Sequence, residues 1–342
     1  MKTIKFPVEI FPTDKKVFKI QEGVYWVKLI LPSMISHVNA YILDDTDGIT
    51  IVDTGLSCNS CINSWRYILR NDFKNRDVKR VIVTHHHPDH MGLMGWFKEN
   101  FNTEVWTSRS SWLTGRMLTL DYKKVVSQES LNFWVSSGMS SELLEKKRIE
   151  KPFNFGDFVK KIPLGYRRIV EDEELMIGNK KWFVKLTDGH APEQVILFCP
   201  DLKIFISADQ LLPGISPNIS VYPTEPTADP LSEYLKSCDK LLKVKDLDYL
   251  VLPGHNLPFY GLNIRIKQIV DHHKSALKRI EEYIDKNPKS AYDIFPALFK
   301  RKIKDSEMVL ALGESVAHLN YLFNNGIIKR EINEKGVNLF VK

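Results

Sequence analysis

Four histidines and one aspartate lie within six consecutive positions of this sequence. They belong to the segment Thr84–Gly92, which reads Thr-His-His-His-Pro-Asp-His-Met-Gly. Only ten histidines occur in the 342 residues, so chance clustering explains the segment poorly. Imidazole and carboxylate groups are common ligands of zinc-like ions, and clusters of this kind usually bind metal. We therefore interpret the segment as a metal site, and the alternative is a polar loop that happens to be rich in histidine.

The position of this cluster predicts where its side chains point. The apolar run Val81–Val83 has the composition of a buried strand, and Pro88 then stops strand pairing. The cluster therefore falls on a loop at the carboxyl end of a strand, where α/β folds place their chemistry. In extended backbone His85 and His87 point to the same side, and His86 points to the other. One ion is expected between His85 and His87.

Five further donors extend the predicted site. The chain turns after the proline, so Asp89 and His90 are expected to reach a second point beside the first. His190, Asp209 and His255 each stand directly after an apolar, strand-like run. A lone histidine is usually an ordinary polar residue, but the shared position at strand ends strengthens the assignment of each. Together with His85 and His87 these make seven donors, enough for two ions with positions left open for water.

The remaining patterns predict the elements that hold this site. Strands are expected over 24–31, 39–44, 49–53, 81–83, 105–107, 175–178, 182–187, 195–198, 204–207 and 249–252, and helices over 61–73, 93–101, 264–285, 291–299 and 309–323. Asp53 ends one of these strands. It is expected either to orient the metal ligands through hydrogen bonds or to be an ordinary turn carboxylate.

The length of the chain fits one large and one small domain. We predict a catalytic domain over 1–263, and a linker helix with a small winged-helix-like domain over 264–342. The second assignment rests on helices followed by a hairpin at 327–341. Residues 108–165 lack strand patterning and read as a helical insertion of two or three helices. This insertion is interpreted as a lid or pocket wall, or as a cap without a role in binding.

Composition excludes some classes of protein. The sequence has no run of eighteen apolar residues, so no membrane span is predicted. Its first ten residues include Glu9 and no apolar core, which does not fit a signal peptide, and a cytoplasmic location is expected. The net charge of +6 permits contact with anionic partners but does not require it.

The four cysteines do not predict a disulfide framework in a chain of this length without an export signal. Cys58 and Cys61 form a CxxC motif. A zinc ribbon needs a second such pair, which the sequence lacks. The motif is therefore interpreted as two cysteines at the start of a helix.

The cluster also resembles a known family. Residues 85–90 match the His-x-His-x-Asp-His signature of the metallo-β-lactamase superfamily, and Gly189-His190, Ser207–Asp209 and Pro253–His255 match its remaining ligand positions in the same order. The resemblance covers about residues 20–260. The tail is similar to the winged-helix unit attached to some β-lactamase-like hydrolases.

This resemblance implies an α/β fold, the αββα metallo-β-lactamase sandwich, with a binuclear site between its sheets. By the family pattern His85, His87 and His190 bind the first ion, Asp89, His90 and His255 bind the second, and Asp209 bridges them. The aspartate bridge is similar to that of glyoxalase II and its relatives. Antibiotic-cleaving members generally lack it, so β-lactamase activity is disfavoured. Glu193 stands where many relatives have a glycine, which weakens the assignment of a glutathione thioester as substrate.

The expected activity is metal-dependent hydrolysis. Two divalent ions, zinc first and iron or manganese as alternatives, would lower the pKa of a bridging water so that the resulting hydroxide attacks the substrate. Asp89 is expected to take or pass a proton while it binds metal. Tyr222 and Tyr260 are candidate pocket walls.

Three classes of function stay open. The favoured one is a hydrolase of a small thioester, ester or lactone, and the alternatives are a phosphodiesterase or ribonuclease, and a nucleic-acid-binding module that uses the winged helix. Residues 311–323 contain no Lys or Arg, although a helix that reads a groove needs such side chains. Nucleic acid is therefore not favoured as a partner, and the tail is expected to pack, to close the pocket or to form a homodimer.

Overall fold

The structure is a computed structural model that describes residues 3–32, 36–285 and 287–342. The chain forms two compact units. The first contains Met1–Tyr122, Asn154–Pro217 and Val244–Arg265, and the second contains Lys123–Phe153, Asn218–Lys243 and Ile266–Lys342. Both units are therefore built from segments that are far apart in the sequence.

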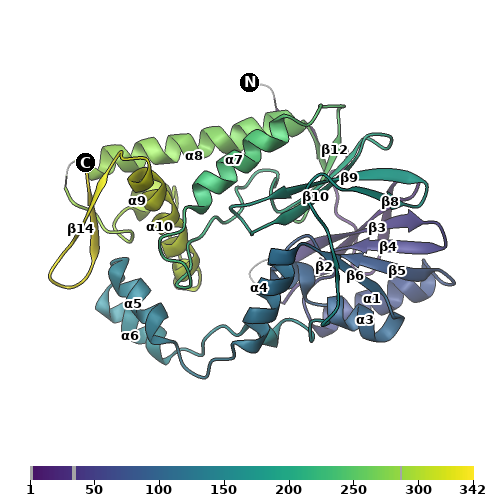
Figure 1. Ribbon diagram of the computed structural model, residues 1–342, viewed down its shortest axis with the longest axis horizontal. Coiled ribbons are helices and arrows are strands. Elements are labelled where there is room, and N and C mark those ends of the chain that lie inside the picture. Colours follow the sequence, from purple (N-terminus) through teal and green to yellow (C-terminus); the bar gives the residue numbers. More distant parts are fainter. Residues whose placement is uncertain (1–2, 33–35, 286) are drawn as a thin grey trace. The chain divides into compact units, whose positions relative to one another are not determined.

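Two sheets form the centre of the first unit. Within the described residues the first sheet has the order β1 (Val17–Gln21), β2 (Val24–Ile30), β3 (His37–Asp45), β4 (Gly48–Val52), β5 (Asp77–Ile82), β6 (Glu104–Thr107) and β7 (Arg167–Arg168). The second has the order β13 (Phe259–Tyr260), β12 (Leu250–Pro253), β11 (Ile204–Ala208), β10 (Gln194–Cys199), β9 (Lys180–Thr187) and β8 (Glu174–Ile177). The pairs from β4 to β7 and the pair β11–β12 are parallel, and the others are antiparallel. Figure 1 shows the sheets as two layers.

Side-chain alternation gives the first sheet two buried faces. In β2, Trp26 belongs to the apolar cluster shared with the second sheet, whereas Val27 and Leu29 belong to a cluster on the opposite face. Helices α1 (Asn59–Asn71) and α3 (Met94–Phe101) pack on that opposite face, where the rings of Trp65 and Phe97 lie 5.3 Å apart. The fold is thus the predicted mixed α/β sandwich.

The other helices divide between the units. The first unit also holds α2 (Pro88–Met91), α4 (Arg109–Leu120) and the short 3₁₀ turn Phe155–Asp157. The helices of the second unit are α5 (Gln128–Ser136), α6 (Ser141–Ile149), α7 (Pro230–Leu242), most of α8 (Leu262–Ile284), α9 (Phe295–Leu298), the 3₁₀ turn Asp305–Glu307 and α10 (Met308–Asn324). The second unit ends in a hairpin of β14 (Lys329–Ile332) and β15 (Asn338–Val341). The predicted insertion 108–165 is helical, and its helices belong to both units. In the described part of the chain, none of the helices is long and apolar enough to cross a membrane.

One predicted helix in the tail is wrong in extent. Only Phe295–Leu298 of the predicted helix 291–299 is helical. The carboxylate of Asp293 accepts hydrogen bonds from the backbone N–H and the hydroxyl of Ser290, at 2.9 and 2.7 Å. Such local bonds from a side chain to the backbone compete with a helix, so this segment forms a turn instead.

Candidate metal centre

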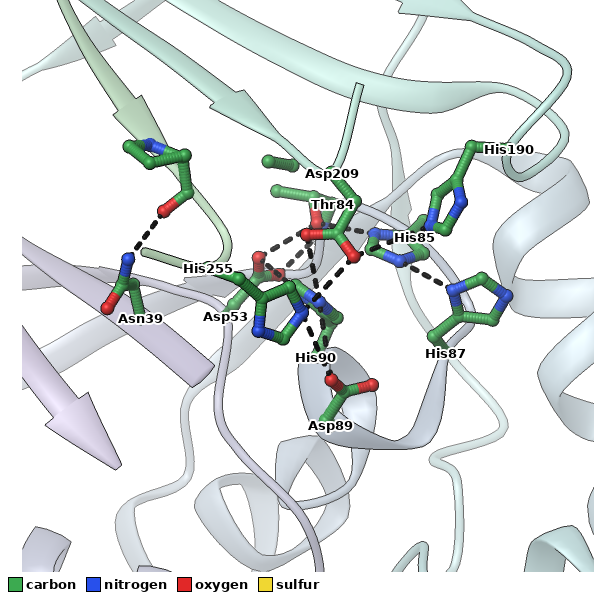
Figure 2. Close-up of polar contacts among 12 residues, drawn as sticks. Asn39, Asp53, Thr84, His85, His87, Asp89, His90, His190, Asp209 and His255 are labelled. Carbon is green, nitrogen blue, oxygen red and sulfur yellow. Dashed lines mark hydrogen bonds and ion pairs between the residues drawn. The ribbon is translucent and has the colours of Figure 1, made fainter. Parts of the chain in front are cut away.

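The structure brings the seven predicted ligands together in the first unit. They form two groups: His85, His87, His190 and Asp209, and then Asp89, His90 and His255. The ligand atoms of each group all lie within 4.8 Å of one another. They come from α2 and from the loops that follow β5, β9, β11 and β12, as Figure 2 shows. Convergence of residues from four separate segments of the sequence is the arrangement that a metal site requires.

Asp209 lies between the two groups. Its Oδ2 atom is 3.5 Å from Nε2 of His190 and 3.2 Å from Nε2 of His255. Its Oδ1 atom is 3.5 Å from Nε2 of His90 (Figure 2). One carboxylate therefore faces both groups of donors.

The chemistry of these donors fits a cation. The Nε2 atom of His90 and the Oδ1 atom of Asp209 are buried without a hydrogen-bond partner among the described residues. An unsatisfied buried polar atom costs about 1–3 kcal/mol, and coordination of a cation would satisfy both atoms. Gly254 keeps this space open, because a Cβ atom there would lie 2.1 Å from Oδ1 of Asp209. A side chain at position 254 would thus compete with the same carboxylate.

Burial and the carboxylates set the protonation of the histidines. Burial holds the pKa of His85 well below its usual value, which keeps this imidazole neutral and able to bind metal. Burial has the same effect on His255, but Asp209 and Asp89 outweigh it and raise the pKa of His255 to about 10. A metal ion would compete with that proton, so metal binding is expected to release protons.

A buried layer of hydrogen bonds fixes the orientation of His90. Asp53 accepts hydrogen bonds from the backbone N–H and the hydroxyl of Thr84, both at 2.8 Å, and Oδ2 of Asp53 lies 2.8 Å from Nδ1 of His90. The carbonyl of His90 accepts from the backbone and side chain of Thr54. These are the contacts that a ligand-orienting residue makes. The sequence indicated Asp53, but it gave no signal for Thr54.

The loop that carries His255 is held by β3. Nδ1 of His255 lies 2.8 Å from the carbonyl oxygen of His37. Asn39 and Tyr41 both donate to the carbonyl of Pro253, at 2.9 and 2.7 Å. Sequence reasoning missed both residues, although an asparagine within an otherwise apolar buried strand was a usable signal.

The loop that carries His190 is tied to α4. The backbone N–H of Glu193 donates to Asp188 at 2.8 Å, and the carboxylate of Glu193 accepts from the backbone N–H of Ser110 at 2.7 Å. Glu193 has a φ of 49°, in the left-handed region that favours glycine. The residue that departs from the family pattern thus connects the His190 loop to the start of a helix.

The two predicted pocket tyrosines differ in burial and belong to different units. Tyr260 is half-buried and packs against the apolar cluster between the sheets. Tyr222 is exposed and belongs to the second unit. Their predicted role in substrate binding stays a prediction.

Comparison with known proteins defines the class. Residues 35–255 match the metallo-beta-lactamase superfamily, and residues 277–342 match the metallo-beta-lactamase-like C-terminal domain. The chain belongs to the metallo-beta-lactamase superfamily and is a metal-dependent hydrolase. Divalent metals are typical of this superfamily, and the candidate His and Asp cluster lies within the matched region.

Similar proteins are found along nearly the whole chain. A crystal structure of a beta-lactamase domain protein from Burkholderia ambifaria is 32% identical, covers 99% of this chain and 98% of its own, and has a TM-score of 0.91. A metallo-beta-lactamase family protein from Thermus thermophilus has the same fold, with 24% identity, coverage of 95% and 100%, and a TM-score of 0.78. The probable metallo-hydrolase YqjP from Bacillus subtilis (strain 168) is 23% identical over 88% of this chain and 92% of its own.

Proposed function

We propose that the chain is a binuclear hydrolase of a small thioester, ester or lactone. In this proposal His85, His87 and His190 hold the first ion, Asp89, His90 and His255 hold the second, and Asp209 bridges them. The observation that carries it is the position of Asp209, whose two carboxylate oxygens lie 3.2–3.5 Å from histidine Nε2 atoms of both groups. This ligand set resembles that of glyoxalase II. Zinc suits these nitrogen and oxygen donors best, and iron or manganese would also fit.

Each part of the site would have a separate task. Two bound divalent ions would activate a water nucleophile and polarise the carbonyl of the substrate. Asp89, whose Oδ2 lies 3.4 Å from Nε2 of His255, would accept the proton that this nucleophile loses. The contact between Asp53 and Nδ1 of His90 keeps Nε2 of His90 directed at Asp209.

The composition of the C-terminal tail, residues 264–342, favours a small substrate over a nucleic acid. Helix α10 contains no Lys or Arg and buries most of its residues, so it has no basic face with which to read a groove. Residues 300–304, a basic run before α10, include Arg301, which pairs with the carboxylate of Glu307 through contacts of 2.7 and 2.9 Å. The aspartate bridge also argues against cleavage of β-lactam antibiotics.

The remaining parts of the proposal concern the domain bounds, the oligomeric state and the cellular location of the protein. We place the catalytic domain at 1–263 and a winged-helix-like domain at 264–342, with the tail packing against its own protein or forming a homodimer. A cytoplasmic location belongs to the same proposal. Size-exclusion chromatography with light scattering would test the dimer.

A hydrolysis panel would test the proposed activity. Metal-defined protein would be assayed with thioesters, esters, lactones, bis-aryl phosphodiesters and single-stranded RNA. Turnover of a carbonyl substrate that falls at least a hundredfold in Asp209→Asn supports the proposal. Faster turnover of a phosphodiester or RNA than of every carbonyl substrate would replace it with the nuclease alternative. A gel shift with no hydrolysis would favour the binding module.

A further inference from the structure

Two cysteines outside the metal centre form a close pair at the start of α1. Cys58 is the N-cap residue, with extended backbone, and Cys61 lies in the first turn of the helix. The N-cap residue and the third helical residue are three positions apart, the spacing at which side chains at a helix start are neighbours. Two cysteines separated by two residues at a helix start are in the arrangement of dithiols that exchange with disulfides.

The two thiols differ in exposure and acidity. Cys58 is half-buried, whereas Cys61 is buried. The neighbouring Cys61 thiol and the Ser60 side chain, whose Oγ atom lies 3.1 Å from Sγ of Cys58, lower the pKa of Cys58 to about 5. The neighbouring Cys58 and burial raise the pKa of Cys61. One sulfur is therefore an accessible thiolate at neutral pH, and the other is a protected thiol beside it.

The absence of a side chain at Gly55 leaves room for the two cysteines. Gly55 lies against Cys61, and a Cβ atom at position 55 would be 3.0 Å from Sγ of Cys61 and 2.7 Å from Cδ1 of Leu29. The φ of Gly55 is 84°, a conformation that glycine adopts freely. The Sγ atom of Cys61 makes a long contact, 3.8 Å, to the carbonyl oxygen of Ile30. This contact is too weak to hold Cys61 away from Cys58.

We propose that Cys58 and Cys61 are a redox-active pair that forms an intramolecular disulfide by exchange with low-molecular-weight disulfides. The Cys58 thiolate attacks one sulfur of the small disulfide, which breaks the S–S bond, forms a mixed disulfide and releases one small thiolate. Cys61 then loses its proton and attacks the sulfur of Cys58, which releases the second small thiolate. The protein loses two protons and two electrons, and the small disulfide takes up both to give two thiols.

Glutathione redox buffers would test the pair directly. The metal-loaded full-length protein would be equilibrated at pH 7 in mixtures of reduced and oxidised glutathione, quenched with acid, alkylated and mapped by mass spectrometry. We expect Cys58 and Cys61 to lose alkylation together in oxidising mixtures, with a peptide two hydrogens lighter. Buried Cys199 and Cys238 should stay alkylatable after unfolding. Cys58 and Cys61 that remain thiols in the most oxidising mixture, or that are protected by a bound metal instead, would overturn the proposal.

Single substitutions would assign the two roles. Cys61→Ser should trap a glutathione adduct on Cys58, because the resolving thiol is absent. Cys58→Ser should give no adduct, because Cys61 is buried. In the wild-type protein, the alkylation rate of Cys58 should be nearly constant between pH 6 and 8, whereas that of an ordinary thiol rises roughly tenfold per pH unit. An adduct on Cys61 but not on Cys58, or an ordinary profile for Cys58, would contradict the assignment.

Discussion

The Nδ1 atom of His90 lies 2.8 Å from Oδ2 of Asp53, and both side chains are buried. The same carboxylate also accepts from the hydroxyl of Thr84. Because Nδ1 faces this carboxylate, Nε2 of His90 is the ring nitrogen left to face Asp209, 3.5 Å away. This contact makes Asp53, a turn residue that follows β4, part of the metal centre.

Replacement of Asp53 by asparagine should weaken metal binding without removing a ligand. Loss of such an orienting partner typically costs 10–100-fold in metal affinity. Competition with a chromophoric zinc chelator would measure the change. Asp45→Asn is a matched control, because Asp45 is a buried turn carboxylate that bonds to Thr50 and Gly178 instead of a ligand. Equal zinc affinities for the two variants would contradict the orienting role of Asp53.

Gly254→Ala should lower the zinc affinity of the metal centre through a steric clash alone. Its Cβ atom would lie 2.1 Å from Oδ1 of Asp209 and 2.8 Å from Cε1 of His90, so the carboxylate must move. We expect at least a tenfold loss of zinc affinity and of hydrolysis. Gly165→Ala is the control, because its Cβ atom meets no described atom within 4 Å. An alanine at position 254 that leaves zinc affinity unchanged would show that Asp209 need not occupy its present position.

Substitutions of Glu193 by alanine and by glycine should separate two contributions to the unfolding free energy, the backbone strain at this residue and its hydrogen bond. Alanine at this position loses the bond to the backbone N–H of Ser110 and keeps the left-handed backbone, at a cost of about 1–2 kcal/mol in unfolding free energy. Glycine also loses the bond but adopts this backbone freely, so it should be about 1 kcal/mol more stable than alanine. Urea denaturation would measure both. If alanine is as stable as glycine, the strain at Glu193 is negligible.

Glu314 in α10 should make the stability of the protein depend on pH. Burial raises the pKa of this carboxyl to about 7, although Asn218 and Arg301 favour its charged form. The folded state therefore binds more protons than the unfolded state between the two pKa values, and stability falls as pH rises from about 4.5 to 7. Relative to Glu314→Gln, the wild-type protein should lose about 2–3 kcal/mol between pH 5 and 8. Parallel urea titrations of both proteins would measure this, and a pH-independent difference would contradict the buried titration.

Much of the fold was predictable because the apolar strands are uninterrupted and end in chemically distinctive residues. His190, Asp209 and His255 were identifiable because each follows such a strand. The hairpin of β3 and β4 was marked by its turn residues, and α10 by its apolar periodicity.

The parts that escaped prediction depend on contacts between distant segments. Asn39 donates a hydrogen bond to the carbonyl of Pro253, which is 214 positions away. No local sequence pattern indicates such a bond. The importance of Gly254 arises only when β11 places Asp209 beside it. The helices of 108–165 were recognisable, but their division between two units depends on packing that the sequence does not display.

Metal stoichiometry tests the central claim most directly. Purified apoprotein would be titrated with zinc and analysed for bound metal, in parallel with Asp209→Asn. The proposed site predicts about two zinc ions per wild-type chain, a variant that retains one or fewer, and loss of hydrolysis along with the missing ion. A wild-type chain that binds a single ion at saturation, or a variant that keeps both ions and full activity, would contradict the account.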